Sequence, residues 1–232
     1  PRRAPDPQVA IVDIDEASLE RVGRWPWPRD TMARLTTALF DRHQARIVAF
    51  DVLFPEADLS GDAAALDELA RRGLRDTPEA RAALAELKSR ADHDGQFATA
   101  LSGRPTVLAF GFTASAQASG MLPAPAFTQA DLAGRTIPIA PETGYTANLP
   151  ALQRAAAAGG HLDPTFDADG VVRRVPMVKR YRDGFHPALA LATVAAAVEA
   201  KSIRPTFDAN GDLVAIDAGG LVVPVAHDGT AL

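Results

Sequence analysis

Short apolar runs alternate with helical patterns along the first half of the chain. Residues 9–14, 47–54 and 106–113 are rich in β-branched and aromatic side chains, a composition that predicts buried strands. Between the first two runs, apolar side chains recur at helical spacing, which predicts a helix from about residue 31 to residue 43. A strand, a helix and a second strand over this length favour a βαβ unit with parallel strands.

The rest of the chain adds elements around this unit. Thr77 and Pro78 form a helix-start signal, because threonine caps a helix and proline is tolerated at its first position. The predicted elements are a helical segment at 63–101, a buried helix at 187–200, hairpins at 159–182 and 213–225, and either a surface excursion or an edge hairpin at 114–145. We therefore predict one α/β domain over residues 1–232, a three-layer α/β sandwich with a mixed, centrally parallel sheet and peripheral β-hairpins.

Composition and charge exclude several classes of function. The formal net charge of −5 opposes an extended phosphate-binding face, so no nucleic acid is expected as a partner. The chain has no cysteine, which excludes disulfides, thiolate metal ligands and thiol nucleophiles. The apolar run at residues 188–198 is shorter than the about 20 residues that a membrane-spanning helix needs. The N-terminus has neither an initiator methionine nor a signal sequence, so we expect a piece of a longer polypeptide.

A proline-stiffened aromatic segment, WPWPR at residues 25–29, interrupts the helical pattern. Each proline fixes its φ angle and lacks an N–H, so the segment is predicted to be an ordered loop. Trp25 and Trp27 are candidates for a platform that binds an apolar or sugar-like ligand, because rigid aromatic rings offer much contact area. The alternative is that the two rings simply pack over the end of the sheet.

Three acidic residues lie within or directly after the first two predicted strands. Asp13 and Asp15 end the first run and Asp51 lies in the second, so parallel pairing would bring these carboxylates to one edge of the sheet. One interpretation is a Mg²⁺ or Ca²⁺ site that serves phosphoryl chemistry. The interpretation that we favour is structural: the acids cap the next helix or form a partly buried ion-pair cluster with Arg29.

Other motifs give no catalytic assignment. Asp163, Asp167 and Asp169 precede Gly170, but no glutamate closes a calcium loop after them, and a tight turn is expected instead. The histidines do not approach the spacing of a zinc site; they are His43, His93, His161, His186 and His227. A nucleophile motif and a phosphate-binding glycine loop are both missing from the sequence, so we predict no catalytic residue and no cofactor.

The order of these segments resembles a known sensory family. Residues 9–19, 23–29 and 45–54 are similar to the opening signature of the CHASE domain of the second type, whose name abbreviates cyclases/histidine kinases associated sensory extracellular. Later segments agree in the same order; they are 94–101, 169–176, 187–191, 223–224 and 228–229. The resemblance spans nearly the whole chain, although the last part of the family domain is expected to be missing after residue 232.

The resemblance implies an extracytoplasmic input domain of a bacterial membrane receptor. It implies that residues 1–7 link the domain to a preceding membrane helix and that further membrane helices follow. The expected output is a cytoplasmic adenylate or guanylate cyclase, histidine kinase, diguanylate cyclase or phosphodiesterase, or Ser/Thr kinase. The expected partner is an unknown small-molecule or environmental signal, and a homodimer is possible.

Two other hypotheses come from the residues alone. One is a metal-dependent phosphoester hydrolase that uses Asp13, Asp15 and Asp51. The other is a module that dimerises receptors and senses nothing.

Overall fold

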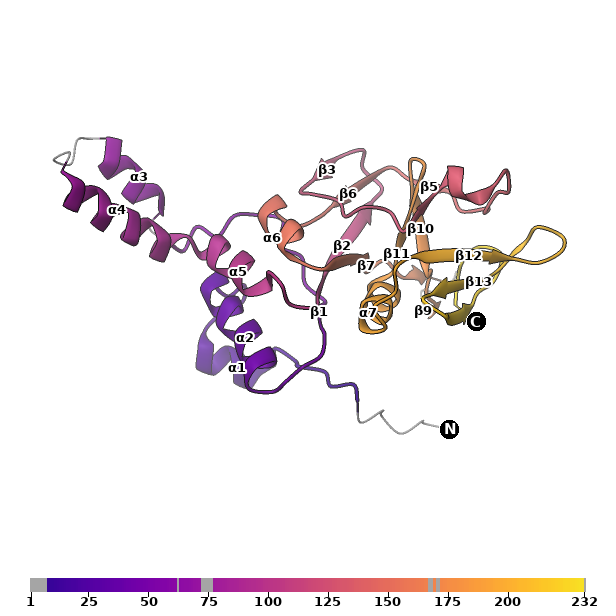
Figure 1. Ribbon diagram of the computed structural model, residues 1–232, viewed down its shortest axis with the longest axis horizontal. Coiled ribbons are helices and arrows are strands. Elements are labelled where there is room, and N and C mark those ends of the chain that lie inside the picture. Colours follow the sequence, from indigo (N-terminus) through magenta and orange to yellow (C-terminus); the bar gives the residue numbers. More distant parts are fainter. Residues whose placement is uncertain (1–7, 62, 72–76, 167–168, 170–171, 232) are drawn as a thin grey trace.

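The central sheet is organised by β2 (Thr106–Thr113), whose first five residues are all buried. The computed structural model describes residues 8–61, 63–71, 77–166, 169 and 172–231 (Figure 1). β2 pairs in parallel with β1 (Val48–Phe50) and with β7 (Ala158–His161), and the shared register places these two strands on opposite sides of it. Strands of a parallel sheet are covered on both faces, which explains why β2 is a continuous apolar run.

Two short strands complete the central sheet. β6 (Gly144–Thr146) is antiparallel to the end of β2, and β3 (Ala118–Ser119) pairs in parallel with β6. The result is a mixed five-stranded sheet with parallel strands at its centre. The predicted mixed α/β class with a centrally parallel sheet is therefore confirmed.

The predicted first strand is wrong. Residues 9–15 have no strand pairing, and Val9 and Ile11 are 71% and 91% exposed. The parallel partner of β1 is β2, and the chain crosses between them through α3 (Ala63–Arg71), α4 (Pro78–Ala91) and α5 (His93–Leu101). The second strand is also shorter than predicted, because the chain leaves the sheet after Phe50.

The helices follow their sequence signals closely. α1 (Glu16–Val22) is capped by Asp15, and α2 (Arg29–Asp41) begins directly after Pro28, two residues earlier than predicted. Thr77 caps α4 by accepting a hydrogen bond from the Ala80 N–H at 3.1 Å, which confirms the predicted helix start.

An antiparallel pair of helices, α3 and α4, extends away from the sheets (Figure 1). We call it the helical arm. Its base is narrow, because Gly61 lies against the Ala91 carbonyl so closely that a Cβ atom would not fit.

Two smaller sheets lie to the right of the central sheet in Figure 1, near the C-terminus of the chain. The second sheet contains β4 (Phe127–Thr128), β11 (Gly184–Pro187), β10 (Val178–Tyr181) and β5 (Pro141–Glu142), in that order. The third contains β12 (Ile203–Phe207), β13 (Leu213–Ala218) and β14 (Leu221–Pro224), and its last two strands confirm the hairpin predicted at 213–225.

The hairpin predicted at 159–182 is confirmed only for its central part, because β7 joins the central sheet and β10 pairs with β11. Between them, β8 (Thr165–Phe166) and β9 (Val172–Arg174) form a small two-stranded sheet. The tight turn expected at Asp167 and Gly170, like the linker at 1–7, lies outside the described residues.

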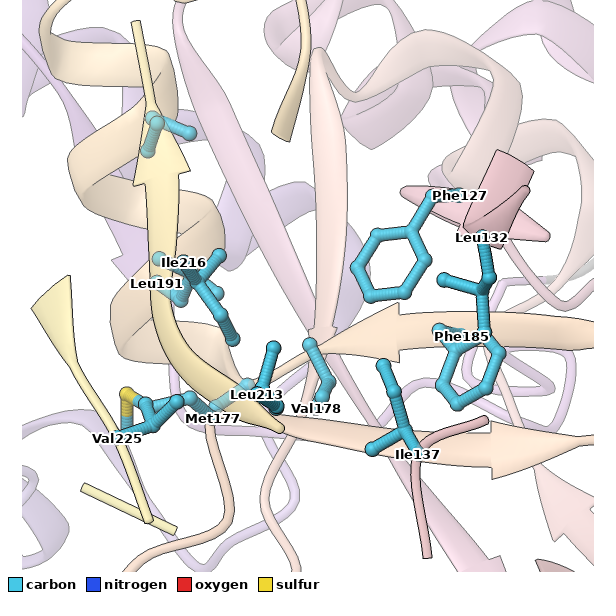
Figure 2. Packing of buried hydrophobic residues seen from close by; sticks show 13 residues of the cluster. Phe127, Leu132, Ile137, Met177, Val178, Phe185, Leu191, Leu213, Ile216 and Val225 are labelled. Carbon is cyan, nitrogen blue, oxygen red and sulfur yellow. The ribbon is translucent and has the colours of Figure 1, made fainter. Parts of the chain in front are cut away.

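The buried helix α7 (Leu189–Ala197) joins the sheets. Its Leu191 belongs to an apolar cluster with side chains from the second and third sheets (Figure 2). In that cluster the rings of Phe127 and Phe185 stack with their centroids 4.9 Å apart. The excursion at 114–145 supplies Phe127 and also holds β3, β5 and the short 3₁₀ helix η1 (Gln129–Leu132).

One buried amide joins the central sheet to the segment that leaves it. Asn148 has no exposed surface and lies just before α6 (Pro150–Ala155). Its Oδ1 accepts a hydrogen bond from the Phe54 N–H at 2.9 Å, and its Nδ2 donates to the Ala109 carbonyl at 2.9 Å and to Gln153 Oε1 at 3.1 Å. The side chain therefore serves two backbone groups that water cannot reach.

The first prediction concerns this amide. Asn148→Ala leaves the Phe54 N–H and the Ala109 carbonyl without their side-chain partner, and each such loss costs about 1–3 kcal/mol. We expect the free energy of unfolding, measured by urea denaturation, to fall by about 2–5 kcal/mol. Asn210→Ala, at an exposed turn, is the matched control and should change it by less than about 0.5 kcal/mol. Equal effects of the two substitutions would contradict the role assigned to Asn148.

Candidate functional site

Residues 25–28 of the WPWPR segment form an ordered loop between α1 and α2, as predicted, and Arg29 begins α2. Trp27 is 7% exposed and its Nε1 donates to the Gly23 carbonyl at 2.8 Å. Trp25 is 38% exposed and meets Trp27 edge-on, with the ring centroids 5.9 Å apart. Trp27 is thus a core residue, whereas Trp25 offers a partly open ring, and a ligand-binding role for that ring stays a prediction.

Arg29 starts α2 and is only 8% exposed. Its guanidinium lies over the Phe54 ring, with Cζ 4.6 Å from the ring centroid, and donates to the Glu56 carbonyl at 3.4 Å. Its Nε lies 3.6 Å from Oδ1 of Asp94. A cation over an aromatic face and beside a carboxylate is stabilised by both, and burial strengthens both attractions.

Asp58 connects the start of α2 to the start of α5. Its Oδ2 accepts a hydrogen bond from the Arg29 N–H at 2.6 Å, and its own N–H donates to Oδ2 of Asp94 at 2.9 Å. A carboxylate at a helix N-terminus satisfies a free N–H group and interacts favourably with the helix dipole. Asp58 thereby ties the segment after β1 to two helices that are far apart in sequence.

Ser60 and His93 complete the hydrogen bonds around Asp58. The Ser60 hydroxyl donates to Oδ1 of Asp58 at 2.5 Å, and Nδ1 of His93 lies 3.3 Å from Oδ2. Burial raises the pKa of Asp58, but hydrogen bonds from Ser60, Arg29 and His93 outweigh it and lower this pKa to about 2. We call Arg29, Asp58, Ser60, His93 and Asp94 the Arg29 network.

The network contains one contact that is electrostatic without a hydrogen bond. Nε of Arg29 and Oδ1 of Asp94 are both buried, and neither has a hydrogen-bond partner among the described residues. They face each other at 3.6 Å, beyond good hydrogen-bond distance. Removing one of the two charges would leave the other buried and uncompensated.

The acids predicted for Arg29 are not its partners. Asp15 accepts hydrogen bonds from the Ser18 hydroxyl and N–H, which lower its pKa, and Asp13 and Asp51 are exposed. The predicted convergence of Asp13, Asp15 and Asp51 at one sheet edge is therefore wrong, because it required residues 9–14 to be a strand beside β1. Within the described part of the chain, no three acidic or histidine side chains lie close enough to hold a metal ion.

The sequence contained only part of the signal for the true partners. Asp94 falls in the first turn of a predicted helix, where acidic residues are common, and Asp58 lies in an irregular segment between the predicted elements. Nothing local marks either residue as a neighbour of Arg29, since the contacts form only when α5 returns to the start of α2.

A groove of about 710 Å³ runs between α2 and α5 beside the network. It is lined by charges of both signs, and two arginines in it are already paired: Arg34 with Asp30 at 2.6 Å and Arg104 with Asp41 at 3.1 Å. Beyond these two pairs, Arg42 is the remaining charged side chain in the described lining of the groove.

Comparisons with known proteins give one match. The family model of the CHASE2 domain matches residues 1–232. Searches of curated proteins and of solved structures found no match to the chain. Of the helices in the described ranges, none has the length and apolar character needed to span a bilayer.

The second prediction tests which acid serves Arg29. Arg29→Ala leaves the buried Oδ1 of Asp94 without its cation and should lower the free energy of unfolding by about 3–5 kcal/mol. A double-mutant cycle in denaturant melts should give a coupling energy of about 1–3 kcal/mol for Arg29 with Asp94→Asn. The same cycle with Asp51→Asn, an exposed carboxylate, is the control and should give a coupling of about zero. A larger coupling energy with Asp51 than with Asp94 would instead support Asp51, the acid predicted from the sequence, as the partner of Arg29.

The third prediction concerns acid stability. Because the folded pKa of Asp58 is about 2, below its ordinary 3.8, Asp58 stabilises the fold fully above pH 3.8 and loses that contribution as the pH falls toward 2. Asp58→Asn should therefore flatten the dependence of the urea midpoint on pH in that interval. Asp13→Asn, an exposed substitution, should leave the dependence unchanged. Identical profiles for the wild type and Asp58→Asn would contradict the assignment.

Proposed function

The chain belongs to the CHASE2 domain family, and from this premise we propose that it is the input domain of a bacterial transmembrane receptor. CHASE2 domains are extracytoplasmic sensory domains that take part in signal transduction. In our proposal the whole of residues 1–232 acts as one such domain on the outer face of the cytoplasmic membrane. It regulates a cytoplasmic cyclase, histidine kinase, diguanylate cyclase or Ser/Thr kinase.

The match over residues 1–232 is the observation that carries this proposal. The Arg29 network supports a positioning role and not a catalytic one. Its carboxylates accept hydrogen bonds from backbone N–H groups and face the guanidinium. They are therefore poorly placed to exchange a proton with a substrate. We assign Arg29 and Trp27 to positioning and Trp25 to ligand contact.

A route for the signal follows from the packing around the loop. Ile14 and Leu19 pack against the apolar cluster that contains Trp27, Met32 and Phe54. Residues 9–15 lead directly into α1, so a change at the Arg29 network reaches the N-terminal segment through few contacts. In the proposed receptor this segment leads toward the membrane.

The fourth prediction tests the location of the domain with reporter fusions and the output with the full-length receptor. Alkaline phosphatase fused after residue 232 should be active, and green fluorescent protein at the same point should be dark, because only the former matures outside the cytoplasm. Arg29→Ala should alter the basal output of the receptor by more than about threefold if the Arg29 network holds the signalling state. Arg34→Ala, whose side chain is exposed, is the matched control and should leave the output unchanged. A cytoplasmic location would reject the proposal.

A further inference from the structure

Two buried histidines meet where the central and second sheets join. His161 ends β7 of the central sheet, and His186 lies in β11 of the second sheet. A backbone bridge pairs His161 with Ala188, the residue directly after β11. We call the two histidines and Ala188 the histidine junction.

Both imidazoles rest on the same pair of aromatic rings. The His161 ring centroid lies 6.5 Å from that of Phe110 and 6.1 Å from that of Phe112. The corresponding distances for His186 are 6.0 and 5.8 Å. The two imidazoles therefore pack on the same apolar surface, although His161 and His186 belong to different sheets.

The imidazoles are buried without the polar partners that buried side chains normally have. The His161 side chain is fully buried, and neither of its ring nitrogens has a hydrogen-bond partner among the described residues. Nδ1 of His186 is also buried and unpartnered within that part of the chain. Such unpartnered groups are costly and uncommon, and their presence in pairs at one junction calls for an explanation.

Few charges face the junction, and they do not compensate a buried imidazolium. Nδ1 of His161 lies 3.9 Å from Oδ2 of Asp163, which already accepts the Phe112 N–H at 3.0 Å. Burial raises the pKa of Asp163, so this carboxyl is itself disfavoured as an anion. Lys179, the nearby cation, is paired with Glu142 at 2.8 Å.

The remaining ionisable groups lie on the second sheet and its neighbours. The Tyr181 ring of β10 stacks on Phe112, meets Tyr145 of β6, and has the Arg182 guanidinium over its face. Asp183 lies in the turn between β10 and β11, and α7 has no ionisable side chain. Within the described ranges, none of these groups forms a hydrogen bond or an ion pair with either imidazole.

The surroundings hold both rings in the neutral form. Burial, the charge of Lys179 and the neighbouring His186 lower the pKa of His161 to about 3. Burial lowers the pKa of His186 to about 4. In an opened arrangement that admits water, both rings would instead titrate near the ordinary histidine value of 6.5.

We propose that the histidine junction is a proton-binding site through which acid outside the cell loosens the second sheet from the central sheet. This inference rests on the proposed function as a sensory domain and names the proton as a signal that it detects. When the junction opens, the ring nitrogens of His161 and His186 become accessible and accept protons from water. The first elements to respond are β11 and α7, because α7 begins one residue after Ala188.

The direction of the effect follows from linkage. Above pH 6.5 both rings are neutral in the closed and in the open arrangement, so the closed one is favoured by packing. As the pH falls below 6.5, only the open arrangement binds protons, and each ring multiplies the open-to-closed ratio by up to about 10 per pH unit. Two rings give a ceiling of about 100-fold per unit, until the closed form also protonates near pH 3–4.

The chain has no cysteine, so a single introduced thiol can report opening. Ala188→Cys places the reporter at the bridge, and Ala100→Cys places a control thiol in the buried face of α5. The labelling rate with 4,4′-dithiodipyridine, divided by the rate for the denatured chain at the same pH, gives the opening constant. We expect this constant to rise at least about 10-fold for Ala188→Cys between pH 6.5 and about 5, and to stay constant for Ala100→Cys.

Removal of the titrating groups separates proton binding from packing. His161→Phe and His186→Phe place aromatic rings beside Phe110 and Phe112 that cannot take up a proton, and together they should reduce the rise to less than about twofold. His43→Gln, at an exposed position, is the matched control and should keep the full rise. If the histidines had only a structural role, the double variant would have a different opening constant at every pH. The dependence of that constant on pH would then be the same as in the wild type.

Three results would overturn the proposal: a flat opening constant at Ala188→Cys, an unchanged slope in the double variant, or an equal rise at Ala100→Cys. If the double variant does not fold, its control thiol labels at the denatured rate, and the wild-type comparison of the two thiols then decides. A negative result leaves the membrane location and the effect of Arg29→Ala untouched, so it is distinguishable from a failure of the proposed function.

Discussion

The buried amide of Asn148 is the interaction on which the arrangement around the central sheet depends. β1 has only three residues, so the chain leaves the sheet while it is still inside the molecule. Phe54 then has a buried N–H and carbonyl, and the first is satisfied by Asn148 Oδ1 and the second by the Leu149 N–H at 2.8 Å. The same amide serves the Ala109 carbonyl of β2. One side chain thus fixes the exit from β1, the centre of β2 and the start of α6.

The position of Phe54 in turn determines the environment of Arg29. The Phe54 ring packs edge-on against Phe97 of α5 at 5.1 Å and carries the guanidinium on its face. Apolar burial and ion pairing are therefore parts of one arrangement, because the ring that fills the core also supports the cation. The removal of this charge from water offsets much of its attraction to Asp94, so the intact pair stabilises the fold by less than the loss of one partner would cost.

The sequence predicted those helices and strands that are determined by neighbouring residues along the chain. Thr77 and Pro78 define a helix start, and the apolar run of β2 defines a strand that is covered on both faces. Residues 9–14 have the same composition as β2, but composition predicts an extended apolar segment and says nothing about whether a neighbouring strand is there to pair with it.

The same distinction applies to the candidate site. Arg29 was identified because it follows a rigid proline loop, whereas its acidic partners depend on how α5 packs against α2. The two buried histidines carry no sequence signal at all, because a histidine in a strand looks the same whether its nitrogens are solvated or not. Long-range packing, and not residue type, decides these roles.

The narrow base of the helical arm makes that arm a separable module. Gly61 and Ala91 touch, so the chain enters and leaves the arm at nearly one point, and most residues of α4 are exposed to solvent. An insertion whose ends are already in contact places no geometric demand on the strands that it separates. A fluorescent protein or an affinity tag grafted in place of residues 63–90 would therefore leave the parallel pairing of β1 with β2 intact.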